Sequence, residues 1–128
     1  MKLRIRSNTL RFRLGQVEVS SLAKEGFVEE QTQLGPNAED VFIYRIESSS
    51  DVERLGLRYQ PGRIRILIAK SLAGGWSDSD EVGFEGNVEV GGGECVSLLV
   101  EKDFACLKPR DLKEDEGAFP HPEAGIQC

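Results

Sequence analysis

The sequence predicts an α+β fold, mainly antiparallel β, with about eight strands in a barrel or sandwich and two short helices. Three observations predict this class. Apolar and polar residues alternate with the period of two that a half-buried strand requires. Glycine, proline, asparagine and serine separate the alternating segments at short intervals. The order of strand, turn and helix signals also repeats after 54 positions.

The repeat is one of pattern more than of identity. When the chain is shifted by 54 positions, Phe12 aligns with Ile66 and Leu22 aligns with Trp76. A unit of this length buries too little surface to be stable alone. The pattern therefore predicts two pseudo-repeats, residues 1–50 and 51–104, that share one core about a pseudo-twofold axis. The other aligned apolar pairs are Leu3/Leu57, Leu10/Ile64, Leu14/Ile68, Val28/Val82, Phe42/Val96, Tyr44/Leu98 and Ile46/Val100, and the identical pairs include Arg4/Arg58, Arg11/Arg65 and Glu47/Glu101.

The first repeat begins with a predicted β-hairpin. Residues 2–6 and 10–14 alternate between basic and apolar side chains, and Ser7-Asn8 supplies the turn, so the outer face of the hairpin is basic. Residues 16–24 carry apolar side chains at helical spacing, and Gly26 is a natural helix C-cap.

Two strands are predicted after this helix. Residues 27–34 are extended and end at Gly35-Pro36-Asn37. Residues 41–47 are apolar on both faces, which predicts a central strand, and residues 48–51 form the loop between the repeats.

The second repeat follows the same plan. Pro61-Gly62 fits the centre of a type II turn, because proline fixes φ and glycine accepts a positive φ. Strands are predicted over residues 53–59, 64–68, 81–90 and 95–102, with a short helix or turn over 70–76 and a hairpin tip at 91–93. Residues 105–128 lie outside the repeat and are predicted to form an irregular acidic C-terminal tail, because they lack periodicity and contain several breakers.

Composition places the chain among soluble single domains. It has 128 residues, of which 39% are hydrophobic and 30% charged. No apolar run approaches the ~20 residues that a membrane span needs, and the alternating charges after Met1 do not form a signal peptide. Three widely spaced cysteines, Cys95, Cys106 and Cys128, predict a reducing cytosol rather than a disulfide scaffold.

The net charge of −6 is unevenly distributed. Residues 1–70 carry 12 Lys/Arg and 9 Asp/Glu, whereas residues 71–128 carry 4 and 13. One interpretation is that oppositely charged surfaces of a single domain attract each other. The other is a basic surface for a polyanion, regulated by the acidic tail.

The tail contains the residues that could bind a metal. Cys106, His121 and Cys128 are of the residue types that bind zinc, and a carboxylate from 114–116 could complete a tetrahedral site. A metal would also hold down a segment that has no periodicity. The spacing matches no standard zinc finger. In the alternative interpretation, Cys106 is a small core residue and the other two are exposed.

The basic face of the first hairpin and its counterpart in the second repeat could follow the phosphates of a nucleic acid. In the alternative interpretation, these arginines form cross-strand ion pairs with acidic residues such as Glu29, Glu47 or Glu53. The pI near 4.9 disfavours nucleic acid. The candidate nucleic-acid residues are Arg4, Arg6, Arg11, Arg13, Arg63 and Arg65, flanked by Lys2 and Arg58.

The sequence gives little support for an enzyme. The single histidine, His121, lies between two prolines in the tail, away from a core that would orient it. Gly91-Gly92-Gly93 lacks the Lys-Ser/Thr and the following helix of a phosphate-binding loop. Trp76 is most simply a core residue.

Two resemblances can be identified. The opening residues 1–14, together with Glu114-Asp115-Glu116, Phe119-Pro120-His121-Pro122 and Cys128, resemble a family of small uncharacterised bacterial proteins, which implies no activity. The first half also resembles the swapped-hairpin module of AbrB-type transition-state regulators over about 30 residues. The shared order is a basic strand, a turn with Asn8, an apolar strand, a short helix, then Gly26 and Val28-Glu29.

The AbrB-type likeness departs before the helix, where Pro-Lys is usual and this chain has Gly15-Gln16. Such modules dimerise, so a tandem copy in one chain would mimic the dimer. We therefore expect a cytoplasmic, non-enzymatic binding or interaction module of undefined ligand. A homodimer is compatible with this expectation, whereas membrane association is not expected.

Overall fold

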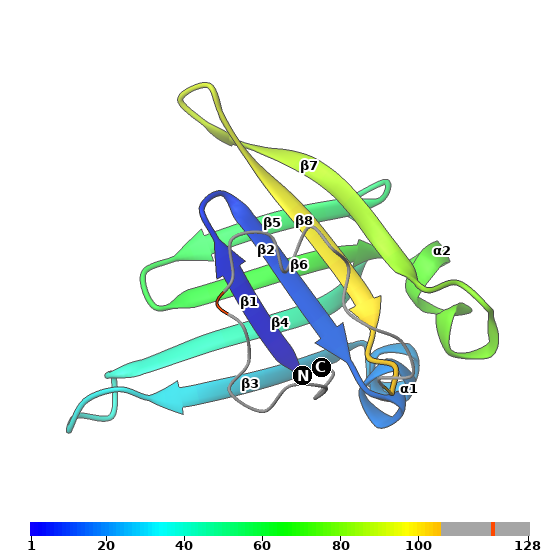
Figure 1. Ribbon diagram of the computed structural model, residues 1–128, viewed down its shortest axis with the longest axis horizontal. Coiled ribbons are helices and arrows are strands. Elements are labelled where there is room, and N and C mark those ends of the chain that lie inside the picture. Colours follow the sequence, from blue (N-terminus) through cyan, green and yellow to red (C-terminus); the bar gives the residue numbers. More distant parts are fainter. Residues whose placement is uncertain (106–118, 120–128) are drawn as a thin grey trace.

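A computed structural model of the chain describes residues 1–105 and 119, and it contains eight strands in two four-stranded sheets (Figure 1). The predicted α+β class with two short helices is confirmed. The elements are β1 (Lys2–Arg6), β2 (Thr9–Leu14), α1 (Gln16–Glu25), β3 (Phe27–Gln33), β4 (Val41–Ser49), β5 (Leu55–Gln60), β6 (Arg63–Ala69), α2 (Lys70–Ala73), the 3₁₀ turn η1 (Trp76–Asp78), β7 (Gly83–Gly91) and β8 (Glu94–Lys102).

The two sheets exchange hairpins between the repeats. Sheet A has the strand order β1-β2-β8-β7, and sheet B has the order β3-β4-β6-β5. The outer pairs of each sheet are antiparallel, whereas the central pairs, β2–β8 and β4–β6, are parallel. The strands of sheet A run diagonally across those of sheet B (Figure 1). Each sheet therefore takes one hairpin from each repeat, an exchange that the periodicity did not predict.

The pairing register repeats along with the topology. Leu3 pairs with Phe12 in sheet A, and the residues 54 positions later, Leu57 and Ile66, pair in sheet B. The parallel pairs obey the same shift, since Thr9↔Ser97 corresponds to Arg63↔Ile43. These matching registers support the predicted pseudo-repeat.

Strand β7 departs from the shift by two residues. Val28 lies opposite Ile46, but the residue opposite Val100 is Phe84, which is buried, and Val82 is 54% exposed. The predicted alignment of Val28 with Val82 is therefore wrong. The segment from Trp76 to Phe84 is two residues longer than the corresponding segment from Leu22 to Val28, and a two-residue slip leaves the same side chains facing the core.

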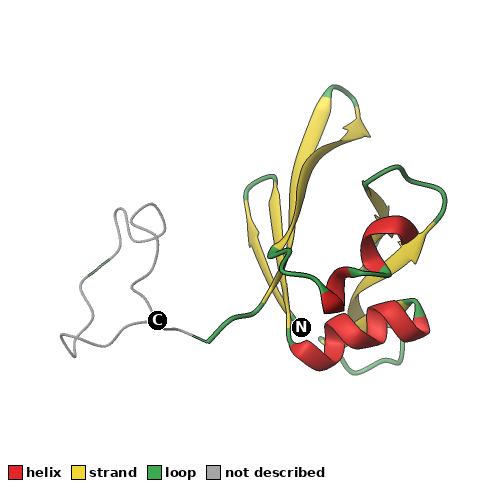
Figure 2. Ribbon diagram, turned by 90° about the vertical axis from the view of Figure 1, so that its right-hand side faces the viewer, coloured by secondary structure: helices red, strands yellow, loops and turns green. Residues whose placement is uncertain are grey.

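The helices close one end of the sandwich (Figure 2). Helix α1 ends at Gly26, whose φ of 89° places it in the left-handed region that glycine tolerates. Trp76 is buried in the core against Phe84, with ring centroids 5.1 Å apart, which confirms its predicted structural role. The largest fully buried side chains are those of Phe12, Leu14, Leu22, Ile46, Ile66, Ile68, Trp76, Leu98 and Val100.

None of the helices in the described part of the chain has the length and apolar character needed to cross a membrane.

Candidate functional site

The outer face of the first hairpin is basic, as predicted. Alternation along β1 and β2 turns Leu10, Phe12 and Leu14 inward, and the register places Arg4 opposite Arg11 on the outside. No acidic residue occurs between positions 1 and 14. We call this set the basic face: Lys2, Arg4, Arg6, Arg11 and Arg13.

Carboxylates from the end of β8 border the basic face. Glu101 accepts hydrogen bonds from Nε of Arg11 at 2.8 Å and from Nε of Arg13 at 3.0 Å. The ammonium of Lys2 lies 3.0 Å from the carboxylate of Asp103. The predicted cross-strand ion pairs therefore form, with Glu101 as the main partner on this sheet.

The second basic hairpin lies on the opposite side of the sandwich. Arg63 and Arg65 belong to the outer face of sheet B, where Nε of Arg65 lies 3.3 Å from Glu47. This confirms Glu47 as an ion-pair partner. The six candidate nucleic-acid arginines are thus divided between two opposite faces, Arg4, Arg6, Arg11 and Arg13 on sheet A and Arg63 and Arg65 on sheet B.

The two halves use the same ion pair. Arg11–Glu101 and Arg65–Glu47 occupy positions related by the shift of 54, and both join strands of different repeats. Oxygen Oε1 of Glu47 is buried and contacts Arg45 and Arg65 at 3.4 and 3.3 Å without hydrogen-bond alignment. The Arg11–Glu101 pair is therefore the better formed of the two.

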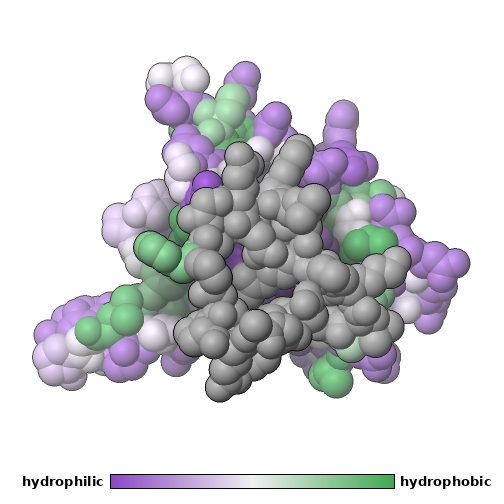
Figure 3. Space-filling model, in the orientation of Figure 1, coloured by the Kyte–Doolittle hydropathy of each residue, from purple (hydrophilic) through white to green (hydrophobic). Residues whose placement is uncertain are grey.

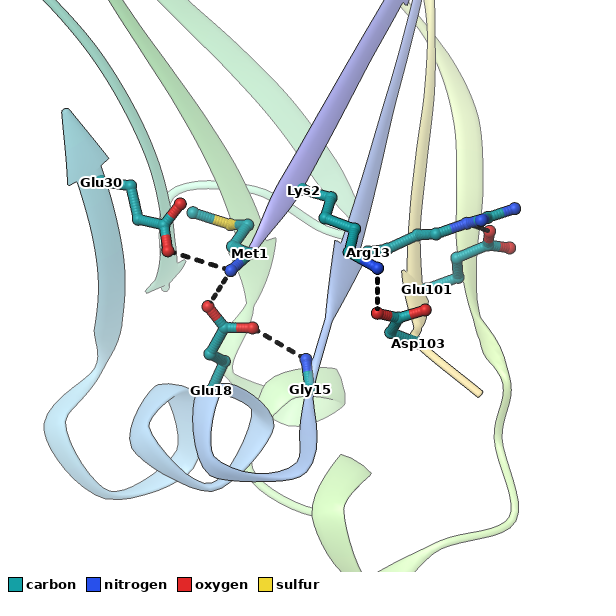
Figure 4. A network of polar contacts seen from close by, with 8 residues as sticks. All are labelled: Met1, Lys2, Arg13, Gly15, Glu18, Glu30, Glu101 and Asp103. Carbon is teal, nitrogen blue, oxygen red and sulfur yellow. Dashed lines mark hydrogen bonds and ion pairs between the residues drawn. The ribbon is translucent and has the colours of Figure 1, made fainter. Parts of the chain in front are cut away.

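The chain terminus forms a polar network that sequence reasoning missed (Figure 4). The Met1 ammonium is shielded from solvent and contacts the carboxylates of Glu18 and Glu30. Glu30 also accepts a hydrogen bond of 2.8 Å from the Tyr44 hydroxyl. Glu18 accepts a second hydrogen bond, from the backbone N–H of Gly15, and so caps α1. The network ties β1, α1, β3 and β4 together at one corner.

The ionisable groups of this network change one another's pKa values. Burial alone would lower the pKa of the Met1 ammonium, but its hydrogen bonds to Glu18 and Glu30 outweigh burial and raise the pKa. Burial would raise the pKa of Glu30, but hydrogen bonds from the ammonium and Tyr44 lower it. Burial and the bond to Glu30 raise the pKa of Tyr44 to about 12. These shifts favour the charged forms of the Met1 ammonium and the Glu30 carboxylate, and the neutral form of the Tyr44 hydroxyl.

A shallow groove of about 420 Å³ runs beside β7 on sheet A. Its walls include Arg54, Phe84, Glu85 and Glu101. It is open to solvent, and its polar groups are mainly carboxylates. Such a cluster does not by itself define a ligand.

Apolar side chains are exposed at the hairpin ends of the two sheets, where Figure 3 shows apolar patches on an otherwise hydrophilic surface. Two pairs of these residues are related by the pseudo-repeat. Ile5 corresponds to Tyr59 at the shift of 54, and Leu34 corresponds to Val90 at the two-residue-longer shift of β7.

The zinc hypothesis is not tested by the structure. Cys106, His121 and Cys128 lie outside the described residues, so their zinc site stays a prediction. Among residues 1–105 and 119, no group of three or more His, Cys, Asp or Glu side chains could hold a metal ion.

A family model described as a family of unknown function (DUF7009) matches residues 1–123. No curated protein and no solved structure matches the chain significantly.

Proposed function

We propose that this chain, which belongs to the DUF7009 family of unknown function, is an interaction module that binds an acidic peptide segment on its basic face. The observation that carries the proposal is the grouping of five cations on two adjacent strands. Glu101 at the end of β8 forms ion pairs with Arg11 and Arg13, and Asp103 just beyond it forms one with Lys2. Residues 1–14 contain no Asp or Glu, so the two strands contribute positive charge alone in a protein that is acidic overall.

The shape of the basic face favours a narrow ligand. Its two strands lie ~4.8 Å apart, about the spacing of one extended chain beside another. Beyond β8 the same face turns acidic, because Glu85 and Glu89 on β7 are exposed on that side. A double helix lying on β1 and β2 would also bring its phosphates against these carboxylates, whereas an extended acidic peptide would not.

Arg4 and Arg6 extend the basic face to its outer edge. Both are exposed on the edge strand β1, farthest from Glu101. Arginine pairs with carboxylates through two parallel N–H···O bonds. This geometry fixes the orientation of the contact in addition to the attraction between opposite charges. Among the described strands, none pairs with the outer edge of β1, and the proposed peptide would lie along that edge.

The test is an NMR titration of the full chain with an acidic peptide of about ten residues, taken to millimolar concentration at low salt, where surface charge is least screened. We expect the amide signals of β1 and β2 to shift. The double substitution Arg4→Gln/Arg6→Gln should weaken binding by about tenfold. The matched control Arg58→Gln/Arg63→Gln changes the net charge equally on the opposite sheet and should leave the affinity unchanged.

Three outcomes would contradict the proposal. The first is the absence of shifts on β1 and β2 at millimolar peptide. The second is equal loss of affinity in both double variants, which indicates an effect of net charge alone. The third is tighter binding of a short DNA duplex of the same charge, which supports the nucleic-acid interpretation instead.

A further inference from the structure

We propose that the end of the sandwich opposite the helices binds the same end of a second copy of this chain. We call this end the turn end, and it is formed by the hairpin turns at residues 7–8, 34–40, 61–62 and 92–93. The proposed function uses the outer face of β1 and β2, so this inference concerns a different surface and does not rest on it. It gives a partner to apolar side chains that the core does not include.

The topology places the four turns at one end. Helix α1 connects the C-terminal end of β2 to the N-terminal end of β3, and α2 with η1 connects β6 to β7 in the same way. The turns lie at the other ends of these strands, so they point away from the helices (Figure 1). The described helices therefore cover one end of the core, and the hairpin turns border the other.

Both repeats expose apolar side chains at the turn end. Ile5 and Tyr59, which the shift of 54 relates, are 55% and 67% exposed. Each lies on the inner face of its sheet, opposite a buried residue of the neighbouring strand. Leu34 and Val90 are exposed beside the other two turns. Exposed apolar groups gathered in this way are typical of the centre of a protein–protein interface.

The charges of the four hairpins alternate around the sandwich. The β1–β2 and β5–β6 hairpins contain Lys and Arg but no Asp or Glu, whereas β3–β4 and β7–β8 contain five and four carboxylates and one cation each. Strand β2 pairs with β8, β7 contacts β5, β6 pairs with β4, and the Met1 ammonium before β1 contacts Glu30 in β3. Each basic hairpin therefore lies between two acidic ones.

The same alternation occurs beside the turns. Arg6 and Arg63 flank the turns of the basic hairpins, and Glu39 and Glu89 lie in or near those of the acidic hairpins, all four being exposed. Two identical ends can face each other about a twofold axis that is perpendicular to the pseudo-twofold axis and passes between neighbouring hairpins. Every acidic turn then lies opposite a basic one. The result is a self-complementary contact with an apolar centre and a rim of opposite charges.

The first test measures the mass of the full chain in solution. Sedimentation equilibrium at low salt and up to about 200 μM should show a species of twice the chain mass of 14.2 kDa. High salt should weaken the dimer, because it screens the charges of the rim. A single species of 14.2 kDa at every concentration would overturn the inference and leave the turn end to a partner other than a second copy.

The second test reverses charges at the turns. Arg6→Glu/Arg63→Glu places carboxylates opposite carboxylates, and Glu39→Lys/Glu89→Lys places cations opposite cations. Each variant should raise the dissociation constant of the dimer at least about tenfold. A chain with all four substitutions restores the attraction and should dimerise again, and an equimolar mixture of the two variants should form the mixed dimer. Unchanged dimerisation of either variant alone, or no recovery in the mixture, would contradict this pairing of turns.

Two further variants separate the turn end from net charge. Lys24→Glu/Lys70→Glu makes the same change in net charge as Arg6→Glu/Arg63→Glu at exposed positions of the two helices and should leave the dissociation constant unchanged. Leu34→Ser/Tyr59→Ser keeps the net charge, removes apolar area from the centre of the contact and should raise the dissociation constant about tenfold. Equal weakening by the helix variant, or no effect of the apolar variant, would contradict a contact at the turn end.

Discussion

Nη2 of Arg11 lies 2.7 Å from the carboxylate of Glu101, and this ion pair joins the first repeat to the second across the parallel strands β2 and β8. Arg65 and Glu47 make the equivalent contact in sheet B at 3.3 Å. These four residues are among the few that are identical between the repeats. The residues that are identical between the repeats therefore include those that join a hairpin of one repeat to a hairpin of the other in each sheet.

Removing the charge of Glu101 should destabilise the fold more than removing that of Glu47. Glu101 accepts aligned charge-assisted hydrogen bonds from Arg11 and Arg13, so Glu101→Gln should lower the free energy of unfolding by about 1–2 kcal/mol. Glu47→Gln should have an effect below ~1 kcal/mol, because its contacts lack hydrogen-bond alignment. Urea denaturation measures both values, with the exposed Glu89→Gln as the control. A larger loss for Glu47→Gln would contradict this ranking.

The network at Met1 should make stability depend on pH in two windows. The raised pKa of the Met1 ammonium means that its contribution is complete below pH 8.0 and is lost as the pH rises through the folded value. The lowered pKa of Glu30 means that its contribution is complete above pH 4.5 and is lost as the pH falls. Tyr44, with its pKa raised from 10.0 to about 12, adds a further loss above pH 10. Thermal unfolding across this pH range measures the profile.

The variant Glu30→Gln isolates this effect. It removes one of the two carboxylates that hold the ammonium, so the fall in Tm both above pH 8 and below pH 5 should become shallower. Glu53→Gln is the control, since Glu53 is exposed and far from Met1 in the sequence. An unchanged profile in Glu30→Gln would show that the network does not contribute to stability.

Gly83 should not tolerate a side chain. A Cβ at this position would lie 2.7 Å from Cα of Glu101 and would also meet the carbonyl oxygen of Val100, so backbone rather than a flexible side chain must move. Gly83→Ala should lower the free energy of unfolding by about 1–3 kcal/mol. Gly75→Ala is the control, because no heavy atom lies within 4 Å of its Cβ, and its effect should be neutral or slightly stabilising. Urea denaturation of both variants measures the two effects. Equal losses of stability in Gly83→Ala and Gly75→Ala would contradict the prediction.

The zinc prediction for the C-terminal residues has a direct measurement. If Cys106, His121 and Cys128 hold zinc, protein purified without a polyhistidine tag should contain one zinc per chain, and His121→Ala should lose it. Cys95→Ser should keep the metal, because Cys95 is exposed on the outer face of β8. A stoichiometry near zero in the natural chain would end the hypothesis.

Most strand and helix positions could be predicted, because each depends on a local signal. Alternation over 2–6 and 10–14 defines the first hairpin, Gly26 ends α1, and Gly62 with φ of 77° makes the turn after Pro61. The exchange of hairpins could not be predicted, because alternation determines which face a strand buries and not which strand lies beside it. The two-residue slip at Phe84 could not be predicted either, because a shift of two residues leaves the alternation unchanged.

The terminal network was also missed, although one signal was present. Glu30 occupies an inward-facing position on β3, aligned with Val28, where an apolar residue is expected. A charge at such a position usually has a partner. That partner is the ammonium of Met1, a backbone group that side-chain patterns do not include.

The exchange of hairpins also affects the order in which the chain can fold. Sheet B is built from the contiguous residues 27–69, whereas sheet A joins residues 2–14 to residues 83–102. Pairs of β2 with β8 connect positions 88 residues apart, such as Thr9 and Ser97. Contacts between residues distant in the sequence form slowly. Sheet B can therefore assemble during synthesis, whereas the first hairpin cannot complete sheet A until β8 has been synthesised. Until β8 is synthesised, β2 has no strand paired along its inner edge, and the apolar face of the hairpin is exposed beside it. This is the stage of folding at which translation speed and chaperones have most influence on this protein.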